Sequence, residues 1–200
     1  MKKKYVQKGT TYETNILLVC TIIRLHTLMD IEYRLAKLND VDGILDFYDL
    51  IIDAQKDEES SAEWTKGIYP SRDIIEDHIK HDKMYLGIID GDIVSAAALA
   101  LKEDEIYEGV HFKYLIDPAV IHILAVNPKY RGLGYARKMV DFLIDEARKQ
   151  NRKVIHLDAL KENTRAQLMY EKLGFDLVEI KPVYYVDTGD HDAYIYEKKI

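Results

Sequence analysis

The sequence predicts a mixed α and β domain, in which strands and amphipathic helices follow one another along most of the chain. Three observations predict it. Apolar residues recur with a helical period in some segments and fill short, unbroken runs in others. Asp90-Gly91 joins two apolar runs of strand length and is a strong hairpin signal, so part of the sheet is antiparallel. The best amphipathic helix, beginning near Gly134, separates two further runs of strand length.

The composition is that of a single globular domain. The chain has 200 residues, of which 48% are hydrophobic and 32% charged. The formal net charge of −7 leaves no basic excess to neutralise phosphates, which argues against a nucleic-acid partner. Cys20 is the single cysteine, so no internal disulfide can form. We expect a cytoplasmic protein with no membrane partner.

The first 28 residues differ from the rest. Lys2, Lys3 and Lys4 precede an apolar run, Ile16–Ile23, which is too short to span a bilayer. The spacer before this run is long and polar, and no small-residue cleavage site follows it, so a signal peptide is disfavoured. We predict that residues 1–28 are a dispensable N-terminal extension and that 29–200 form the domain.

The first half of the domain should hold one strand, two helices and the hairpin. The strand is Ile31–Ala36, and Asn39 with Asp42 resembles a capped helix start. An apolar stripe runs from there to Ile52, and Ser71 can cap a second helix. The hairpin strands are Met84–Ile89 and Ile93–Leu101, and a long polar loop follows at 102–117.

The second half alternates between strands and helices. Val120–Val126 and Lys153–Leu157 are the strands on either side of the helix that begins near Gly134. Asn163 or Thr164 can cap a last helix that stops at Gly174. Two closing strands are expected at Phe175–Ile180 and Ala193–Glu197, with a turn at Asp187–Asp190 between them.

The most informative segment is the glycine turn, Arg131–Ala136, which lies between a strand and the best helix. A turn of this kind presents free backbone N–H groups at the positive end of a helix dipole, and therefore suits a phosphate. It is not a P-loop, because no lysine followed by Ser or Thr comes after the last glycine. A dinucleotide site, with Asp158 as the ribose acid, is disfavoured because Arg137 stands at the third glycine position.

The glycine turn and a second segment carry a family resemblance. Arg131-Gly132-Leu133-Gly134-Tyr135-Ala136 matches the Arg/Gln-x-x-Gly-x-Gly/Ala pattern of the GCN5-related N-acetyltransferase (GNAT) superfamily. Asn163-x-x-Ala166-x-x-x-Tyr170-Glu-Lys-Leu-Gly-Phe175 resembles that family's second half-site. The resemblance covers roughly residues 31–200. It implies a mixed, mostly antiparallel sheet of six to seven strands with about four helices, whose two parallel central strands splay apart.

The resemblance also implies a site for acetyl-CoA, with no metal. Leu124, Ala125 and Val126 would line the pantetheine arm in the gap between the splayed strands. The backbone of Gly132, Leu133, Gly134, Tyr135 and Ala136 would hold the pyrophosphate, with Arg131 adding a positive charge. Asn163 would bind the pantetheine amides, cap the last helix, or do both.

The implied chemistry is direct attack of an amine on the thioester. The Val126 amide would donate to the oxyanion, and Tyr170 would be the general acid unless it only packs in the core. Many relatives have a glutamate base on the central strand, but this strand carries no carboxylate. His122 stands where arylalkylamine-type relatives have a histidine, and is either the base or a buried structural residue. Strand alternation would place His122 on one face with Leu124 and Val126.

The acceptor is the least defined part. The resemblance points to Trp64, Tyr69 and Tyr184 as substrate contacts and to a small-molecule amine or a peptide as acceptor. Acidic residues in the 102–117 loop would either attract a cationic amine or simply be exposed to solvent, and we favour solvent exposure. These residues are Glu103, Asp104, Glu105 and Glu108. A non-catalytic acyl-CoA-binding module and an acetyltransferase of ribosomal-protein N-termini are the alternatives. Homodimers are common in the family, although nothing here demands one.

Overall fold

The computed structural model describes residues 30–185 and 188–200. The chain separates into two units, Met1–Ile31 and Glu32–Ile200, and the fold described here is that of the second. The predicted extension, residues 1–28, lies outside the described residues. Within the described ranges, no helix is long and apolar enough to cross a membrane.

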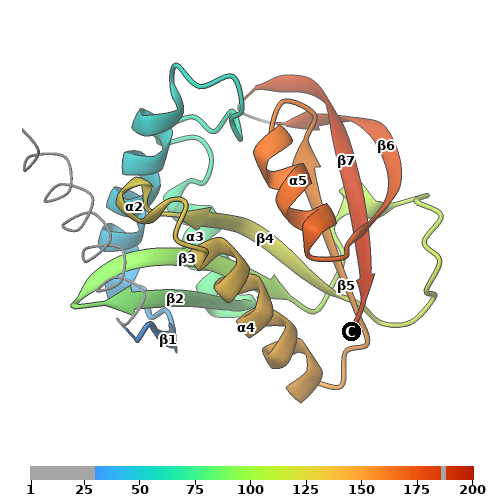
Figure 1. Ribbon diagram of the computed structural model, residues 1–200, viewed down its shortest axis with the longest axis horizontal. Coiled ribbons are helices and arrows are strands. Elements are labelled where there is room, and N and C mark those ends of the chain that lie inside the picture. The colour runs from blue at the N-terminus through green and yellow to red at the C-terminus, as the bar shows by residue number, and fades with distance from the viewer. Residues whose placement is uncertain (1–29, 186–187) are drawn as a thin grey trace, which may run out of the picture. The chain divides into compact units, whose positions relative to one another are not determined.

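A seven-stranded sheet forms the centre of this unit, in the order β1-β2-β3-β4-β5-β7-β6 (Figure 1). Only β4 and β5 pair in parallel, and every other neighbouring pair is antiparallel. The predicted fold class is therefore confirmed. The strands are β1 (Glu32–Leu35), β2 (Lys83–Ile89), β3 (Asp92–Ala100), β4 (Ala119–Val126), β5 (Val154–Leu160), β6 (Asp176–Tyr185) and β7 (Gly189–Lys199).

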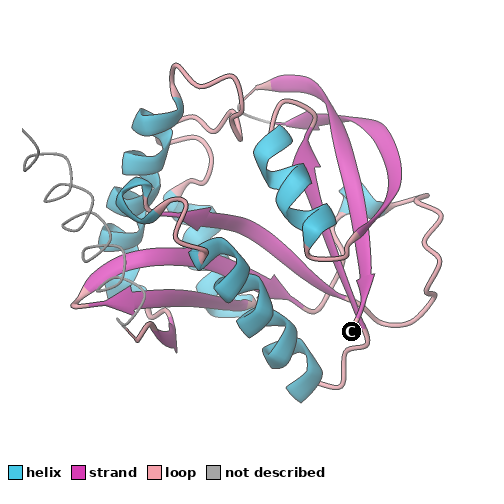
Figure 2. Cartoon of the chain, in the orientation of Figure 1, coloured by secondary structure: helices cyan, strands magenta, loops and turns pink. Residues whose placement is uncertain are grey.

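Helices cover both faces of the sheet (Figure 2). The α2 and α3 helices pack on one face, where Ile44, Ile51 and Ile75 meet the β2 and β3 residues Leu86 and Ala96. The α4 and α5 helices belong to the core on the other face. The helices are α2 (Val41–Gln55), α3 (Arg72–His81), α4 (Tyr135–Lys149) and α5 (Thr164–Lys172), with short 3-10 turns at Leu38–Asp40, Glu105–Tyr107 and Pro128–Tyr130.

Most predicted helix ends are correct, but the first is not. Asn39 lies inside a 3-10 turn, and Asp40 is the residue that precedes α2. The Asp40 carboxylate accepts the backbone N–H of Lys37 at 2.7 Å and two hydrogen bonds from Arg34, so it holds the entering turn rather than the helix. Ser71, in contrast, caps α3 as predicted, with its Oγ accepting from the Ile74 amide at 3.3 Å.

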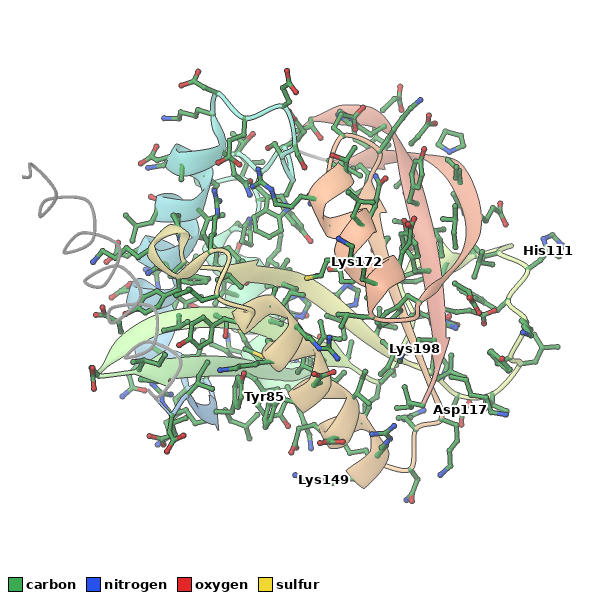
Figure 3. The ribbon with its side chains drawn as sticks, viewed as in Figure 1. Tyr85, His111, Asp117, Lys149, Lys172 and Lys198 are labelled. Carbon is green, nitrogen blue, oxygen red and sulfur yellow. The ribbon has the colours of Figure 1, made fainter. Side chains whose placement is uncertain are left out.

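Polar contacts tie the second pair of helices to the strands. The Tyr85 hydroxyl of β2 donates to Glu146 of α4 at 2.9 Å. Lys198 of β7 donates to the Leu173 carbonyl at the end of α5, and its side chain is labelled with that of Tyr85 in Figure 3. Because β2 and β7 are on opposite sides of the β4–β5 junction, these contacts fix one helix on each side of it.

Candidate active site

The two parallel strands are paired only at their beginnings. Ala119 pairs with Ile155 and Val120 with His156, and no further partners follow although both strands continue (Figure 1). The other edges of these strands are paired with β3 and β7. The facing edges therefore leave backbone groups in a gap, where an extended ligand can hydrogen-bond to them. This is the expected splay.

A β-bulge in β4 changes the face of the sheet on which its side chains lie. Ala96 and Ala98 of β3 pair with Ala125 and His122, so β4 holds one extra residue there. Ile123 takes φ 47°, and its carbonyl accepts the Tyr48 hydroxyl at 2.6 Å. The bulge inverts the alternation of side chains beyond it.

The predicted shared face of His122, Leu124 and Val126 is therefore wrong. His122 stacks on His78 of α3, with ring centroids 5.6 Å apart, while Leu124 packs with the core on the α4 side. Ile123 and Ala125 instead take the α2 side. The expected base and the expected pantetheine-lining side chain thus come from opposite faces of the strand.

The glycine turn has the geometry of an anion site. Gly132 and Gly134 have φ of 76° and 82°, which favour glycine, and Gly134 is the residue that precedes α4. A Cβ on either would meet no atom within 4 Å, so the space beside the turn is open. Among the described residues, the amides of Gly132, Leu133 and Ala136 donate no backbone hydrogen bond. The turn therefore offers N–H groups that the fold itself does not use.

Arg131 forms an ion pair with Glu58. Its Nη1 lies 2.8 Å from Oε1 of Glu58, and the other Glu58 oxygen lies 2.8 Å from Nη1 of Arg165. Partial burial opposes ionisation of Glu58, but Arg165 and Arg131 together lower its pKa. The α2–α3 loop thus connects the turn after β4 to the first turn of α5. Glu58 and Arg165 could not be identified from the sequence, because a contact across 73 or 107 residues leaves no local signal.

The second half-site occupies the start and middle of α5. The Oδ1 of Asn163 accepts the Ala166 amide at 3.3 Å, so this residue is a helix cap. Tyr170 is buried, with ring centroids 5.7 Å from Phe175 and 6.0 Å from Tyr196. Burial raises the pKa of Tyr170, and the nearby charge of Asp158 raises it further. The phenol is therefore protonated at neutral pH and can donate a proton.

His122 is a buried imidazole, one of whose nitrogens has no hydrogen-bond partner among the described residues. Its side chain is 9% exposed, and its Nε2 has no hydrogen-bond partner in the described chain. The nearest carboxylate oxygen, Oδ2 of Asp104, is 3.6 Å away. Burial lowers the pKa of His122, although Asp104 and Asp158 oppose this. A neutral imidazole can accept a proton at Nε2, as a base must.

Asp158 lies on β5, across the gap from His122. Its two oxygens accept the hydroxyls of Tyr107 at 2.9 Å and Tyr185 at 3.3 Å. Burial raises the pKa of Asp158, against the opposing effects of His122 and the two tyrosines. His156, also on β5, is stacked on Phe112 and has its Nδ1 2.6 Å from Glu103.

A pocket of about 740 Å³ opens beside His122 and Asp158. Tyr69 and Tyr184, two of the three predicted substrate residues, line it. The third, Trp64, packs against Tyr48 and Tyr69 and is absent from the lining formed by the described residues. The remaining lining residues are Glu103, Asp104, Glu105, Ile106, Lys181, Pro182, Val183 and Tyr185.

Comparison with known protein families agrees with this geometry. The model of the acetyltransferase (GNAT) family matches residues 46–175, and the chain belongs to this family. The match includes the splayed strands, the glycine turn and the second half-site.

Curated relatives match over shorter segments. The chain is 35% identical over 82 residues to the [ribosomal protein bS18]-alanine N-acetyltransferase of Escherichia coli K12, which is 40% of this chain and 55% of that protein. It is 37% identical over 70 residues to N-alpha-acetyltransferase 30 of Saccharomyces cerevisiae, covering 35% of this chain and 40% of that protein. The chain thus spans about half the length of the curated relatives it matches.

Solved structures match the fold as a whole. A GNAT-family acetyltransferase from Listeria monocytogenes superposes with a TM-score of 0.68 at 19% identity, over 86% of this chain and 96% of that one. A putative acetyltransferase from Salmonella typhimurium, solved with its cofactor acetyl-CoA, gives a TM-score of 0.59 at 17% identity, over 85% and 94%. These two likenesses establish the fold.

Proposed function

We propose that this protein transfers the acetyl group of acetyl-CoA to a primary amine of a small molecule or a peptide. The observation that carries the proposal is the gap between β4 and β5, which ends at a glycine turn with unused amides. An extended amide-bearing arm with a pyrophosphate at its end fits both features. Family membership and the acetyl-CoA bound by the Salmonella neighbour support this choice of ligand.

Acetyl-CoA supplies a thioester carbon to which the amine forms a C–N bond, while the C–S bond breaks and sulfur leaves with its electron pair. In this proposal the Val126 amide donates to the carbonyl oxygen. The Asn127 amide donates to Val94 of β3 at 2.9 Å, and successive amides of a strand point to opposite edges, so that of Val126 points into the gap.

Two side chains are available for the proton transfers. His122 lines the pocket, its Nε2 has no hydrogen-bond partner among the described residues, and it takes the proton that the ammonium form of the amine must lose. Tyr170 donates a proton to the departing sulfur, and burial keeps its hydroxyl protonated until that step. Direct attack requires both groups to reach the same gap from opposite sides.

A second class of acceptor is the N-terminal amine of a protein. The E. coli relative is named a [ribosomal protein bS18]-alanine N-acetyltransferase, and the yeast relative an N-alpha-acetyltransferase. These names favour the N-terminal amine of a protein as acceptor, with ribosomal proteins as the narrower alternative.

The test is the release of CoA from acetyl-CoA in the presence of amines and of short peptides with free N-termini. We expect acceptor-dependent release in the wild type and a loss of about 100-fold or more in the His122→Gln variant. Tight acetyl-CoA binding with no release for any acceptor would instead identify a non-catalytic binding module.

A further inference from the structure

The acceptor pocket is strongly acidic. Among the described residues, four carboxylates line it, Glu103, Asp104, Glu105 and Asp158, against one ammonium group, that of Lys181. Sequence analysis favoured a merely solvated acidic loop, but the structure brings three consecutive acidic residues of that loop to the pocket wall. Such an excess of negative charge attracts cations into a concave site.

These carboxylates are not equally available. Glu103 is held by His156, and both oxygens of Asp158 accept tyrosine hydroxyls. The carboxylates of Asp104 and Glu105, in contrast, accept no side-chain hydrogen bond from the described residues, and the Asp104 side chain is 61% exposed. Lys181 forms no ion pair with these carboxylates among the described residues, and its Nζ donates to the Glu108 carbonyl at 2.9 Å.

An independent observation points to a ligand in the same pocket. His122 lines the pocket and is nine-tenths buried, yet its Nε2 lacks a hydrogen-bond partner in the described chain. Leaving a buried polar atom unsatisfied is unfavourable, so a partner is expected there. Since the imidazole is neutral and Asp104 lies 3.6 Å from it, an N–H donor of a cation satisfies both groups.

We infer that the acceptor carries two positive charges: the amine to be acetylated, which meets His122, and a second cationic group held by Asp104 and Glu105. This inference rests on the proposed acetyltransferase function and narrows its substrate class. The shared chemistry is found in an alkyl diamine and in a peptide with a Lys or Arg side chain close to its N-terminus.

The experiment compares matched acceptors by their kcat/KM for CoA release. One pair is 1,5-diaminopentane and pentylamine, and the other is Ala-Arg amide and Ala-Gln amide. The second charge should raise kcat/KM at least tenfold in at least one pair, and the pair that responds distinguishes the two sources. The preference should shrink in 0.5 M NaCl, because salt screens exposed charges.

Variants of the acidic loop test which residues cause the preference for a dicationic acceptor. Glu105→Gln should reduce kcat/KM for the dication at least threefold, mainly through KM, and leave the monoamine within twofold. Glu108→Gln is the matched control, since this side chain belongs to the same loop but not to the pocket lining, and should keep the full preference. Binding of acetyl-CoA should be unchanged in both variants.

The possible outcomes distinguish a failure of the inferred dicationic acceptor from a failure of the proposed acetyltransferase function. Equal kcat/KM for monocations and dications, with CoA released from both, would overturn the inference and leave the acetyltransferase function standing. A preference that survives Glu105→Gln together with Asp104→Asn would also overturn it. No release from any of the four acceptors would contradict the proposed function, and the inference would fall with it.

Discussion

The two sides of the β4–β5 gap are built in different ways. The proposed cofactor side is made of backbone: strand edges without partners and a turn whose amides the fold does not use. The proposed acceptor side is made of side chains from the α2–α3 loop, the 101–118 loop, β4, β5 and β6. A backbone site accepts any ligand with the right pattern of amides and phosphates, whereas a side-chain site can differ between relatives that share the fold.

This contrast explains why the family is evident and the acceptor is not. The glycine turn and the Asn163–Phe175 segment are continuous in sequence. The acceptor pocket draws on residues from Tyr69 to Tyr185, and its charge arises only when these meet. Substitutions on the cofactor side should therefore affect every acceptor equally, and those on the acceptor side should discriminate between acceptors.

After His122→Gln, the largest effect is expected at Tyr170, the proposed general acid. Tyr170→Phe keeps the buried ring and removes the hydroxyl, so turnover should fall about 100-fold while acetyl-CoA affinity stays constant. Steady-state rates and calorimetry measure the two quantities. Tyr196→Phe is the control, because its hydroxyl donates to Glu171 on the helix and should be dispensable for turnover. Unchanged turnover in Tyr170→Phe would remove the phenol from the mechanism.

The glycine turn should give the next largest effect. Gly134→Ala adds a Cβ at φ 82°, beside the amides proposed to hold pyrophosphate, and should weaken acetyl-CoA binding about tenfold. Gly91→Ala matches the strain, at φ 87°, but lies in the β2–β3 turn. Titration calorimetry should show native affinity in Gly91→Ala. Equal losses in both variants would attribute the effect to folding and not to the turn's contacts.

The Glu58 ion pairs should oppose cofactor binding by a smaller amount. Glu58→Gln frees Arg131 and Arg165 for phosphate, so acetyl-CoA affinity should rise about threefold to fivefold at low salt. Glu59→Gln, an exposed neighbour, should leave the affinity as it is. A weaker affinity in Glu58→Gln would mean that the carboxylate helps to position Arg131.

The smallest expected signal is the titration of His122. Burial lowers its pKa, so NMR of the imidazole protons should find a midpoint below about 6.5, with His122→Gln assigning the resonance. Since the folded-state pKa lies below the unfolded value, the contribution to stability is complete above about pH 6.5 and is lost as the pH falls. A midpoint above 6.5 would place a carboxylate in closer contact than the structure shows.

Local chemistry made much of the fold predictable, and long-range contacts limited the rest. The Asp90-Gly91 hairpin, the Ser71 and Asn163 caps and the start of α4 all depend on residues adjacent in sequence. The bulge at Ile123 does not, because a β-branched residue is a poor match for positive φ and is held there by Tyr48, 75 residues away. Because of the bulge at Ile123, His122 does not share a face of the sheet with Leu124 and Val126, as strand alternation predicted.

The central claim is that the gap and the glycine turn form an acetyl-CoA site, and calorimetric titration of the protein with acetyl-CoA, free CoA and NAD tests it most directly. The account predicts saturable binding of acetyl-CoA and CoA at one molecule per chain, with no heat from NAD. Binding of NAD without acetyl-CoA would contradict it and would restore a dinucleotide site with Asp158 as its ribose-binding acid.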